Sequence, residues 1–348
     1  MTRFQMILSG LLALQIVLIA VFGGVFGGGE SASGERALLR DLDLSTVSRI
    51  EIAESDGDSI TLGRENGAWV LEDFDGYPAE NSKIENVLET LQELSVRRPV
   101  VTGSGYHESL EVTDENFQRR LRIWTANEDP DFDLIVGSSP TYRVHHVRLA
   151  DEDPVYEIRG LDLWSIGTSP DAWIERNLVD IDADKVVALE WSNEQGTYSI
   201  RKEGEEWRSG NDLLDANEVD SFLRSASTVW IAAPVGRADP ASRGLDPPTA
   251  SVKLSWQVSE TTGSDPSDPQ GEKSGEAEER AGESVQPEVK TLTWMIGAEP
   301  PDDDARRFAA VAGSGYAVVV SESSVKKILE TKAADLEAEA KGSEKPAH

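Results

Sequence analysis

The chain contains an internal repeat, and no other feature of the sequence limits its possible folds as strongly. Short segments of the first half recur in the second half in the same order and with similar spacing. The separation is 139 residues at the start, where Asp41 corresponds to Asp180 and Glu51 to Glu190. Later matches include Trp69 with Trp207, Leu110 with Leu245, and Gly137 with Gly297. We therefore expect two tandem copies of one fold.

Each half begins with alternating apolar and polar residues, the pattern of strands that bury one face. Asn66-Gly67 and Gln195-Gly196 supply the residues that tight hairpin turns favour. The predicted strands are Ser48–Ala53, Ser59–Arg64 and Ala68–Glu72 in the first half, and Val186–Ser192, Thr197–Lys202 and Glu206–Ser209 in the second.

An amphipathic helix follows these strands in each half. Apolar residues recur at helical spacing through Glu80–Ser95 and again through Asn217–Trp230. A helix that covers one face of a mostly antiparallel sheet buries both apolar surfaces. The predicted fold class is therefore α+β, in two tandem copies, and a charged helix is expected at Ser324–Lys341.

The N-terminal stretch Met6–Phe26 contains 21 residues and no charged side chain. As a helix it would be about 31 Å long, close to the thickness of a bilayer core. We expect a single-pass transmembrane helix in the inner (cytoplasmic) membrane, with the N-terminus in the cytoplasm and the body in the periplasm. A cleaved signal peptide is the alternative. A buried core helix fits poorly beside the glycine-rich segment that follows.

These expectations define the domain organisation. The parts are a head (1–5), a membrane segment (6–26), a linker (27–38), a first copy (39–178), a second copy (179–336) and a disordered tail (337–348). The second copy contains a stretch rich in Gly, Ser, Pro and Glu at 258–290, which we interpret as a disordered acidic insertion between two strands.

Charge and cysteine content exclude several functions. The chain of 348 residues has 33 basic and 64 acidic side chains, a net charge of −31, so nucleic acid is not an expected partner. Because cysteine is absent, disulfides, thiolate nucleophiles and cysteine-ligated metal sites are also excluded.

The sequence offers no metal or cofactor site that stands out. His107 lacks the second histidine of a zincin motif, and His145 and His146 are adjacent in a predicted strand, so they point to opposite faces. Asp180–Asp184 has the spacing that begins a calcium loop, but Lys185 replaces the required glycine. We interpret these aspartates as turn residues that bind local backbone. No cofactor is expected.

No catalytic motif is found either. The chain lacks a G-x-S-x-G elbow and a P-loop. The chain has so many carboxylate side chains that the sequence singles out no pair for acid–base catalysis. Asp129, Asp131 and Asp133 are expected at polar loop tips. Most tryptophans are expected in the core, whereas Trp164 and Trp173 lie outside the matched strands and are the candidate ligand contacts.

The order of these segments resembles the DUF4340 family, a domain of unknown function found in membrane-anchored bacterial proteins. The resemblance extends over Leu39–Leu336 and rests on the segment Asn177–Asp182, the hairpin ending in Trp69 and the Gly-Leu-Asp-Pro step at Gly244–Pro247. The first copy departs from this step at Leu110–Thr113. The resemblance implies an accessory protein often encoded beside an ABC-type ATPase, a permease and gliding-motility-like components, and it carries over no catalytic residue.

We therefore expect a non-enzymatic, membrane-anchored and envelope-facing interaction protein. Its partners would be membrane lipid, contacted through residues 6–26, and an ABC-type permease or auxiliary subunit. One alternative is a periplasmic glycan- or ligand-binding protein that uses a cleft between the copies. A carboxylate-dependent hydrolase is the third reading.

Overall fold

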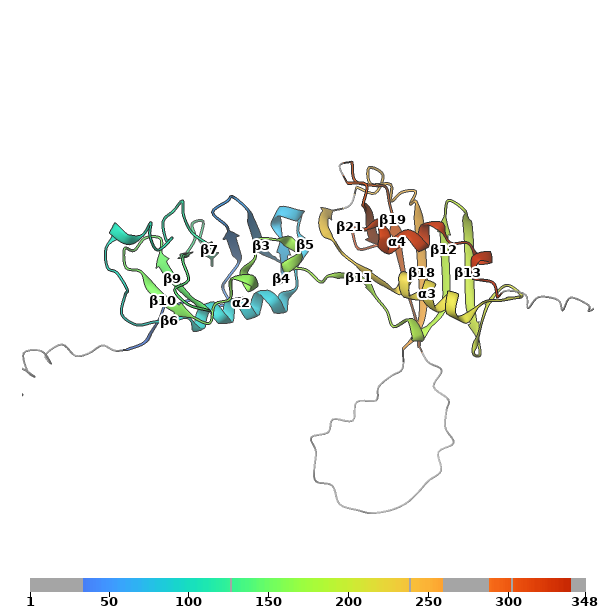
Figure 1. Cartoon of the computed structure of the whole chain (residues 1–348), viewed down its shortest axis with the longest axis horizontal. Coiled ribbons are helices and arrows are strands. Elements are labelled where there is room, and N and C mark those ends of the chain that lie inside the picture. Colours follow the sequence, from blue (N-terminus) through green and yellow to red (C-terminus); the bar gives the residue numbers. More distant parts are fainter. Residues whose placement is uncertain (1–33, 126, 238, 259–287, 302, 339–348) are drawn as a thin grey trace, which may run out of the picture. The chain divides into compact units, whose positions relative to one another are not determined.

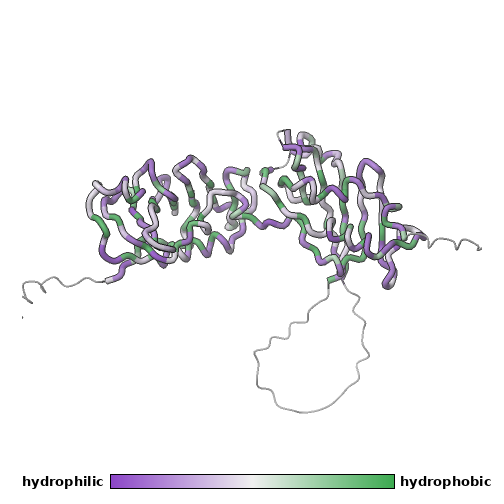
Figure 2. Tube along the Cα trace, in the orientation of Figure 1, coloured by the Kyte–Doolittle hydropathy of each residue, from purple (hydrophilic) through white to green (hydrophobic). Residues whose placement is uncertain are grey.

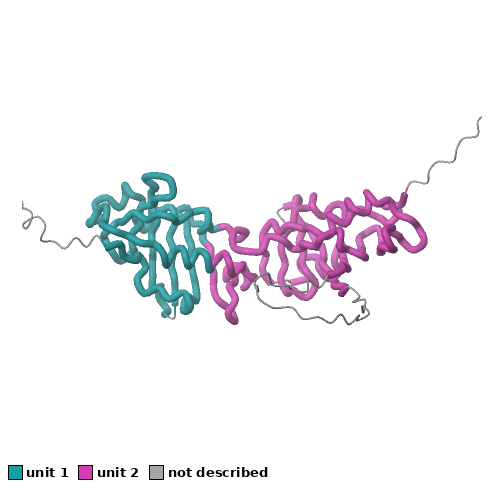
Figure 3. Tube along the Cα trace, turned by 90° about the horizontal axis from the view of Figure 1, so that it is seen from below, with its two compact units in different colours: residues 1–59, 85–168 teal, residues 60–84, 169–348 magenta. Residues whose placement is uncertain are grey.

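The computed structural model describes residues 34–125, 127–237, 239–258, 288–301 and 303–338. Their contacts divide the chain into two compact units (Figure 3). Unit 1 contains residues 1–59 and 85–168, and unit 2 contains residues 60–84 and 169–348. Each unit is described by itself. The predicted boundaries of the two copies, at 39–178 and 179–336, remain a prediction.

The first large sheet has eight strands in the order β10-β9-β8-β7-β2-β3-β4-β5 (Figure 1). All the strand pairs described in it are antiparallel. A small two-stranded sheet joins β1 to β6. The strands are β1 (Arg36–Ala37), β2 (Arg49–Ala53), β3 (Ser59–Glu65), β4 (Ala68–Leu71), β5 (Tyr77–Pro78), β6 (Ser95–Val96), β7 (Arg119–Trp124), β8 (Phe132–Val136), β9 (Val144–Leu149) and β10 (Tyr156–Arg159).

Hydrophobic and hydrophilic residues alternate along many of these strands (Figure 2). Because successive side chains of a strand point to opposite faces, this alternation sends apolar side chains to one face. Ile52 on β2 and Leu121 on β7 are both fully buried and lie directly opposite each other. Helix α2 (Asn81–Glu93) runs along the sheet in Figure 1 and buries Leu88 and Leu91. The helix therefore begins and ends inside the predicted range.

The second large sheet has nine strands in the order β15-β14-β13-β12-β18-β19-β20-β21-β17. A second small sheet joins β11 to β16. The strands are β11 (Asn177–Asp180), β12 (Val186–Asn193), β13 (Gly196–Glu203), β14 (Glu206–Ser209), β15 (Asp212–Leu213), β16 (Thr228–Trp230), β17 (Ala233–Arg237), β18 (Ala250–Val258), β19 (Glu288–Ile296), β20 (Arg306–Val311) and β21 (Tyr316–Ser321).

Two helices pack against this sheet, α3 (Ala216–Ser227) and α4 (Glu322–Glu330). Trp191 of β12 contacts Phe222 of α3 edge to face, with 4.8 Å between ring centroids. The indole N–H of buried Trp294 donates to the carbonyl of Ala226 at 3.2 Å. Both contacts anchor helix α3, because large buried rings supply much of the apolar area.

Both large sheets share one loop arrangement. A loop crosses each sheet so closely that a Cβ built on Gly137 would lie 2.3 Å from the carbonyl oxygen of Leu110, and one on Gly297 would lie 2.2 Å from that of Arg243. In both loops the next residue adopts a left-handed conformation, Glu111 at φ 57° and Gly244 at φ 64°. Val112 therefore occupies the place of Leu245, and the sequence match of Leu110 with Leu245 is wrong by two residues.

The predicted fold class, α+β with an N-terminal transmembrane helix, is wrong. The described residues form four sheets and only three α-helices. Pairing between strands involves many more of these residues than the helices do, so the sheets dominate the fold. None of the described helices has the length and apolarity needed to cross a membrane. Residues 6–26 lie outside the described residues. The expected helix at Ser324–Lys341 is replaced by α4 and a short 3-10 turn at Ala333–Leu336.

The remaining predicted segments lie largely outside the described residues. These are the head (1–5), most of the linker (27–38), the tail beyond Ala338 and most of the insertion (258–290). The insertion joins neighbouring strands, because Val258 at the end of β18 pairs with Glu288 at the start of β19.

Candidate functional site

Unit 1 contains a cavity with a volume of about 680 Å³. Its wall carries both signs of charge, with more carboxylates than guanidinium groups. The charged lining residues are Arg36, Arg40, Arg120, Asp114, Asp131, Asp133, Asp151 and Glu152. A cavity with this lining suits a polar partner better than an apolar ligand.

Strand β7 supplies the central charge of this site. Leu121 and Ile123 are fully buried, so the alternating neighbours Arg120 and Arg122 project from the opposite face of the sheet. On neighbouring β8, Asp133 is the register partner of Arg122. The strand pairing therefore places opposite charges on adjacent strands.

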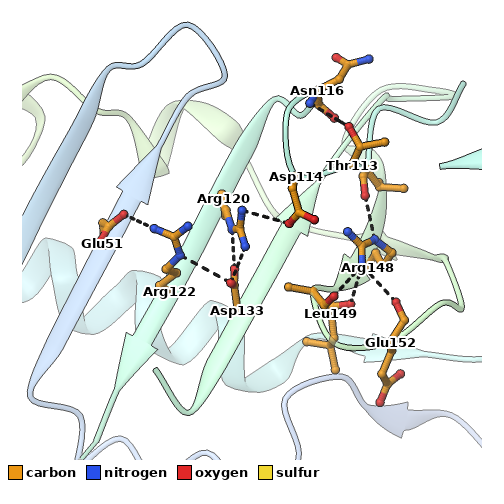
Figure 4. Close-up of polar contacts among 12 residues, drawn as sticks. Glu51, Thr113, Asp114, Asn116, Arg120, Arg122, Asp133, Arg148, Leu149 and Glu152 are labelled. Carbon is orange, nitrogen blue, oxygen red and sulfur yellow. Dashed lines mark hydrogen bonds and ion pairs between the residues drawn. The ribbon is translucent and has the colours of Figure 1, made fainter. Parts of the chain in front are cut away.

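The charges form a connected network (Figure 4). Arg120 binds Asp133 with two hydrogen bonds, Nε to Oδ1 at 2.8 Å and Nη2 to Oδ2 at 2.7 Å. Arg120 Nη1 also lies 3.2 Å from Asp114. Arg122 links the same Asp133, at 3.5 Å, to Glu51 on β2, at 2.6 Å. The bidentate pairing of Arg120 with Asp133 fixes the orientation of both side chains.

A third arginine, Arg148, anchors the loops beside this network. Arg148 on β9 is only 6% exposed. Its guanidinium donates to the carbonyls of Val112, Ala150 and Glu152 at 2.8, 2.8 and 3.2 Å. A buried charge is tolerated where its donors are hydrogen-bonded, so Arg148 holds the loop over the sheet.

The electrostatics favour fixed charge over proton transfer. The hydrogen bond that Arg120 donates to Asp133 raises the pKa of Arg120. The hydrogen bond from the Thr125 hydroxyl, followed by that from its backbone N–H, lowers the pKa of Asp131. A general acid working near neutral pH needs a raised carboxyl pKa instead. Arg120 and Asp131 therefore keep their charges near neutral pH, and a site with such fixed charges can bind charged groups.

The three described histidines are buried. The imidazole Nε2 of His107 lies 2.8 Å from the carbonyl oxygen of Asp153, and Nδ1 of His146 lies 3.1 Å from the Ser138 hydroxyl. Nδ1 of His145 has no hydrogen-bond partner among the described residues. Burial lowers the pKa of His145.

The described residues contain no group of three or more histidines and carboxylates arranged to hold a metal ion. Asp182 instead accepts from the backbone N–H of Asp184 at 3.1 Å, and Asp43 accepts from that of Ser45 at 3.0 Å. The prediction of local backbone binding is therefore confirmed for Asp182, whereas Asp180 lies in β11 and its carboxylate accepts from the side-chain amide of Asn177 at 3.2 Å.

The two predicted ligand contacts differ in exposure. Trp164, in the 3-10 turn Leu163–Ile166, is 92% exposed. Trp173 is 1% exposed, so the expectation that it lies at the surface is wrong. The ring is part of the core, although the sequence around Trp173 shows no strand or helix pattern that would predict its burial.

The charge network was missed by sequence reasoning. Asp133 was expected at a loop tip, but it lies within β8. The available signal was the pair Arg120 and Arg122, which alternates with the apolar residues Leu121 and Ile123, because alternating side chains of a strand point to opposite faces. Their partners depend on which strands are neighbours, and the sequence does not state this.

Comparison with known proteins gives one family match. The model for a domain of unknown function, DUF4340, matches residues 69–248, more than half of the chain. No curated protein and no solved structure shows significant similarity to the chain.

Proposed function

The chain belongs to the DUF4340 family, and from that premise we propose that it is a membrane-anchored, envelope-facing interaction protein without catalytic activity. Residues 6–26 would provide the attachment to lipid. The partner would be an ABC-type permease or an auxiliary subunit of a transport or gliding-associated complex.

The observation that supports this function most is the pairing of opposite charges in the charged cavity of unit 1. Its central arginine and carboxylates are engaged with one another, which leaves a rigid surface of alternating charge. Such surfaces give specificity and orient a partner through complementary charge. At the rim, Arg40 and Asp151 are exposed and have no hydrogen-bond or ion-pair partner among the described residues, so they are free to meet a second protein.

Co-purification tests this proposal. The full tagged chain is extracted from membranes in mild detergent, and bound proteins are identified by mass spectrometry. We expect a membrane protein partner whose recovery falls at least about tenfold in the double variant Arg40→Glu, Asp151→Lys, because rim charges contribute to partner choice.

The matched control is Lys202→Glu, Glu205→Lys on the β13–β14 hairpin, which also leaves the net charge unchanged. Recovery should stay at the level of the unmodified chain. A chain that remains monomeric and recovers no membrane protein would contradict the proposal, as would equal losses in both double variants.

A further inference from the structure

One surface of unit 1 combines exposed aromatic rings with four arginines, three of which have no side-chain partner among the described residues. We define the basic–aromatic face as Arg97, Arg98, Val100, Tyr142, Arg143, Arg159 and Trp164. Tyr142 and Trp164 are 87% and 92% exposed, the highest values among the exposed large hydrophobic side chains of the described chain. Rings with this degree of exposure indicate a contact surface.

The strand pairing brings the two parts of this face together. Arg159 on β10 is the register partner of Val144 on β9, and the N–H of Gly160 donates to the carbonyl of Arg143 at 3.4 Å. Tyr142 is adjacent to this contact, and Trp164 follows it by four residues. Arg97, Arg98, Val100 and Arg159 line one cavity of about 360 Å³.

The arginines of this face differ from those of the charge network. Unit 1 has about two acidic side chains for every arginine, and the network arginines are bound to carboxylates. In the described part of the chain, the guanidinium groups of Arg98, Arg143 and Arg159 have no hydrogen-bond or ion-pair partner. Free guanidinium groups of this kind bind phosphate oxygens well.

The nearby acids leave the face close to neutral. They are Glu35, Glu93, Glu157 and Asp162. Glu35 is engaged by Ser95 at 2.7 Å and Arg97 at 3.6 Å, and Asp162 accepts from the N–H of Trp164 at 3.1 Å. Because unit 1 as a whole is strongly acidic, an anionic surface repels this nearly neutral face less than it repels an average face of the unit.

The chain enters unit 1 beside this face. Glu35 lines the same cavity as Arg98 and Arg159, and Arg36 pairs with Val96. Only residues 27–33 separate the apolar stretch from the described chain, and seven extended residues reach about 25 Å at most. A membrane that holds residues 6–26 would therefore be within reach of the face.

We propose that the basic–aromatic face docks on the surface of an anionic phospholipid bilayer. Trp164 and Tyr142 insert at the headgroup level, and Arg98, Arg143 and Arg159 contact lipid phosphates. Tryptophan and tyrosine favour this interface because one end of the ring system is apolar and the other is wet. The inference rests on the proposed membrane anchoring and adds which surface of unit 1 meets the lipid.

The absence of cysteine allows a direct test. Trp164→Cys, Tyr142→Cys and Asp56→Cys variants of the full chain are labelled with a fluorophore and reconstituted into vesicles that contain headgroup-level lipid quenchers. Asp56 is the matched control, because it is exposed in the same unit but follows β2, four strands from β10, or about 19 Å at the strand spacing.

We expect the labels at 164 and 142 to be quenched at least about twofold more than the label at 56 in vesicles of phosphatidylcholine mixed with phosphatidylglycerol. The triple substitution Arg98→Glu, Arg143→Glu, Arg159→Glu should remove at least about half of that excess, as should phosphatidylcholine alone. The substituted side chains are exposed, and circular dichroism would verify that each variant folds.

Equal quenching at the three positions would overturn the inference. Flotation with the vesicles separates this outcome from failure of the proposed function, since an anchored chain floats whichever face meets the lipid. A chain that does not float refutes both the anchoring and the docking. A label at 164 that is shielded only by the co-purified protein, and not by lipid, would assign the face to that partner and refute lipid docking.

Discussion

At the scale of single residues, two equivalent glycines hold the loops that cross the sheets. Gly137 has no room for a Cβ, because Leu110 and Glu111 carbonyl oxygens lie 2.3 and 2.5 Å from its position. We expect Gly137→Ala to lower the free energy of unfolding by about 3 kcal/mol, since backbone must move to relieve the overlap.

Urea unfolding of the full chain checks this value. The control is Gly105→Ala, where a Cβ would meet nothing within 4 Å and the backbone is not left-handed. Its effect should stay within about 0.5 kcal/mol. Similar losses in the two variants would mean that the close approach of the loop is not what stabilises unit 1.

The second prediction at this scale concerns the buried side chain of His145. Burial lowers its pKa below the ordinary value of 6.5, so the unfolded chain binds a proton at this residue more readily than the folded chain. Stability is therefore complete above pH 6.5 and falls as the pH drops below it, by at most about 1.4 kcal/mol per pH unit for this group.

Thermal unfolding at pH 7.5 and at pH 5.5 measures this effect. The difference in melting temperature between the two values should shrink in His145→Gln, which cannot take up the proton. If the variant keeps the full difference, other groups cause the acid sensitivity.

At the scale of elements, helix α3 depends on Asp215, the N-cap residue just before its first turn. The carboxylate of Asp215 accepts from the backbone N–H groups of Asn217 and Glu218 at 2.9 and 3.2 Å. We expect Asp215→Ala to cost about 1 kcal/mol, because these donors have no partner within the helix. Chemical denaturation provides the measurement, with Asn217→Ala as the control in the same turn. Asn217→Ala should be neutral or slightly stabilising, and a loss as large as that of Asp215→Ala would contradict the capping role.

The boundaries of the elements show which of them the sequence pattern predicts. Strand β14 begins and ends where alternation predicts, at Glu206 and Ser209, and β12 extends one residue beyond its predicted end. Helix α3 stops at Ser227, although its apolar spacing continues to Trp230. The last three residues instead form β16, paired with β11, because pairing with a distant segment competes with local helix formation.

At the scale of the whole molecule, charge is the dominant property. A net charge of −31 means that acidic side chains repel one another in the folded chain. Salt screens this repulsion, whereas partly buried pairs such as Arg120–Asp133 are screened less. We expect the melting temperature to rise by a few degrees between low salt and about 0.3 M NaCl. A steady fall over the same range would mean that surface ion pairs outweigh the repulsion.

The sequence by itself determined the properties that depend on neighbours along the chain. These include the alternating strands, the amphipathic course of α2, the turn aspartates Asp43 and Asp182, and the acidic character of the molecule. Each follows from side-chain period or local hydrogen bonding, which act over a few residues. Local patterns do not show how much of the chain pairs into sheets, so the predicted helices were given too much weight in the predicted fold class.

Only the tertiary structure decided which charges meet. Glu51 and Arg122 are 71 residues apart, and their 2.6 Å contact exists because β2 and β7 are neighbours in the sheet. The exposure of Trp164 and the burial of Trp173 were decided in the same way, by what packs around each ring. Strand order and register are set by burial summed over the whole sheet, so no short segment of sequence contains them.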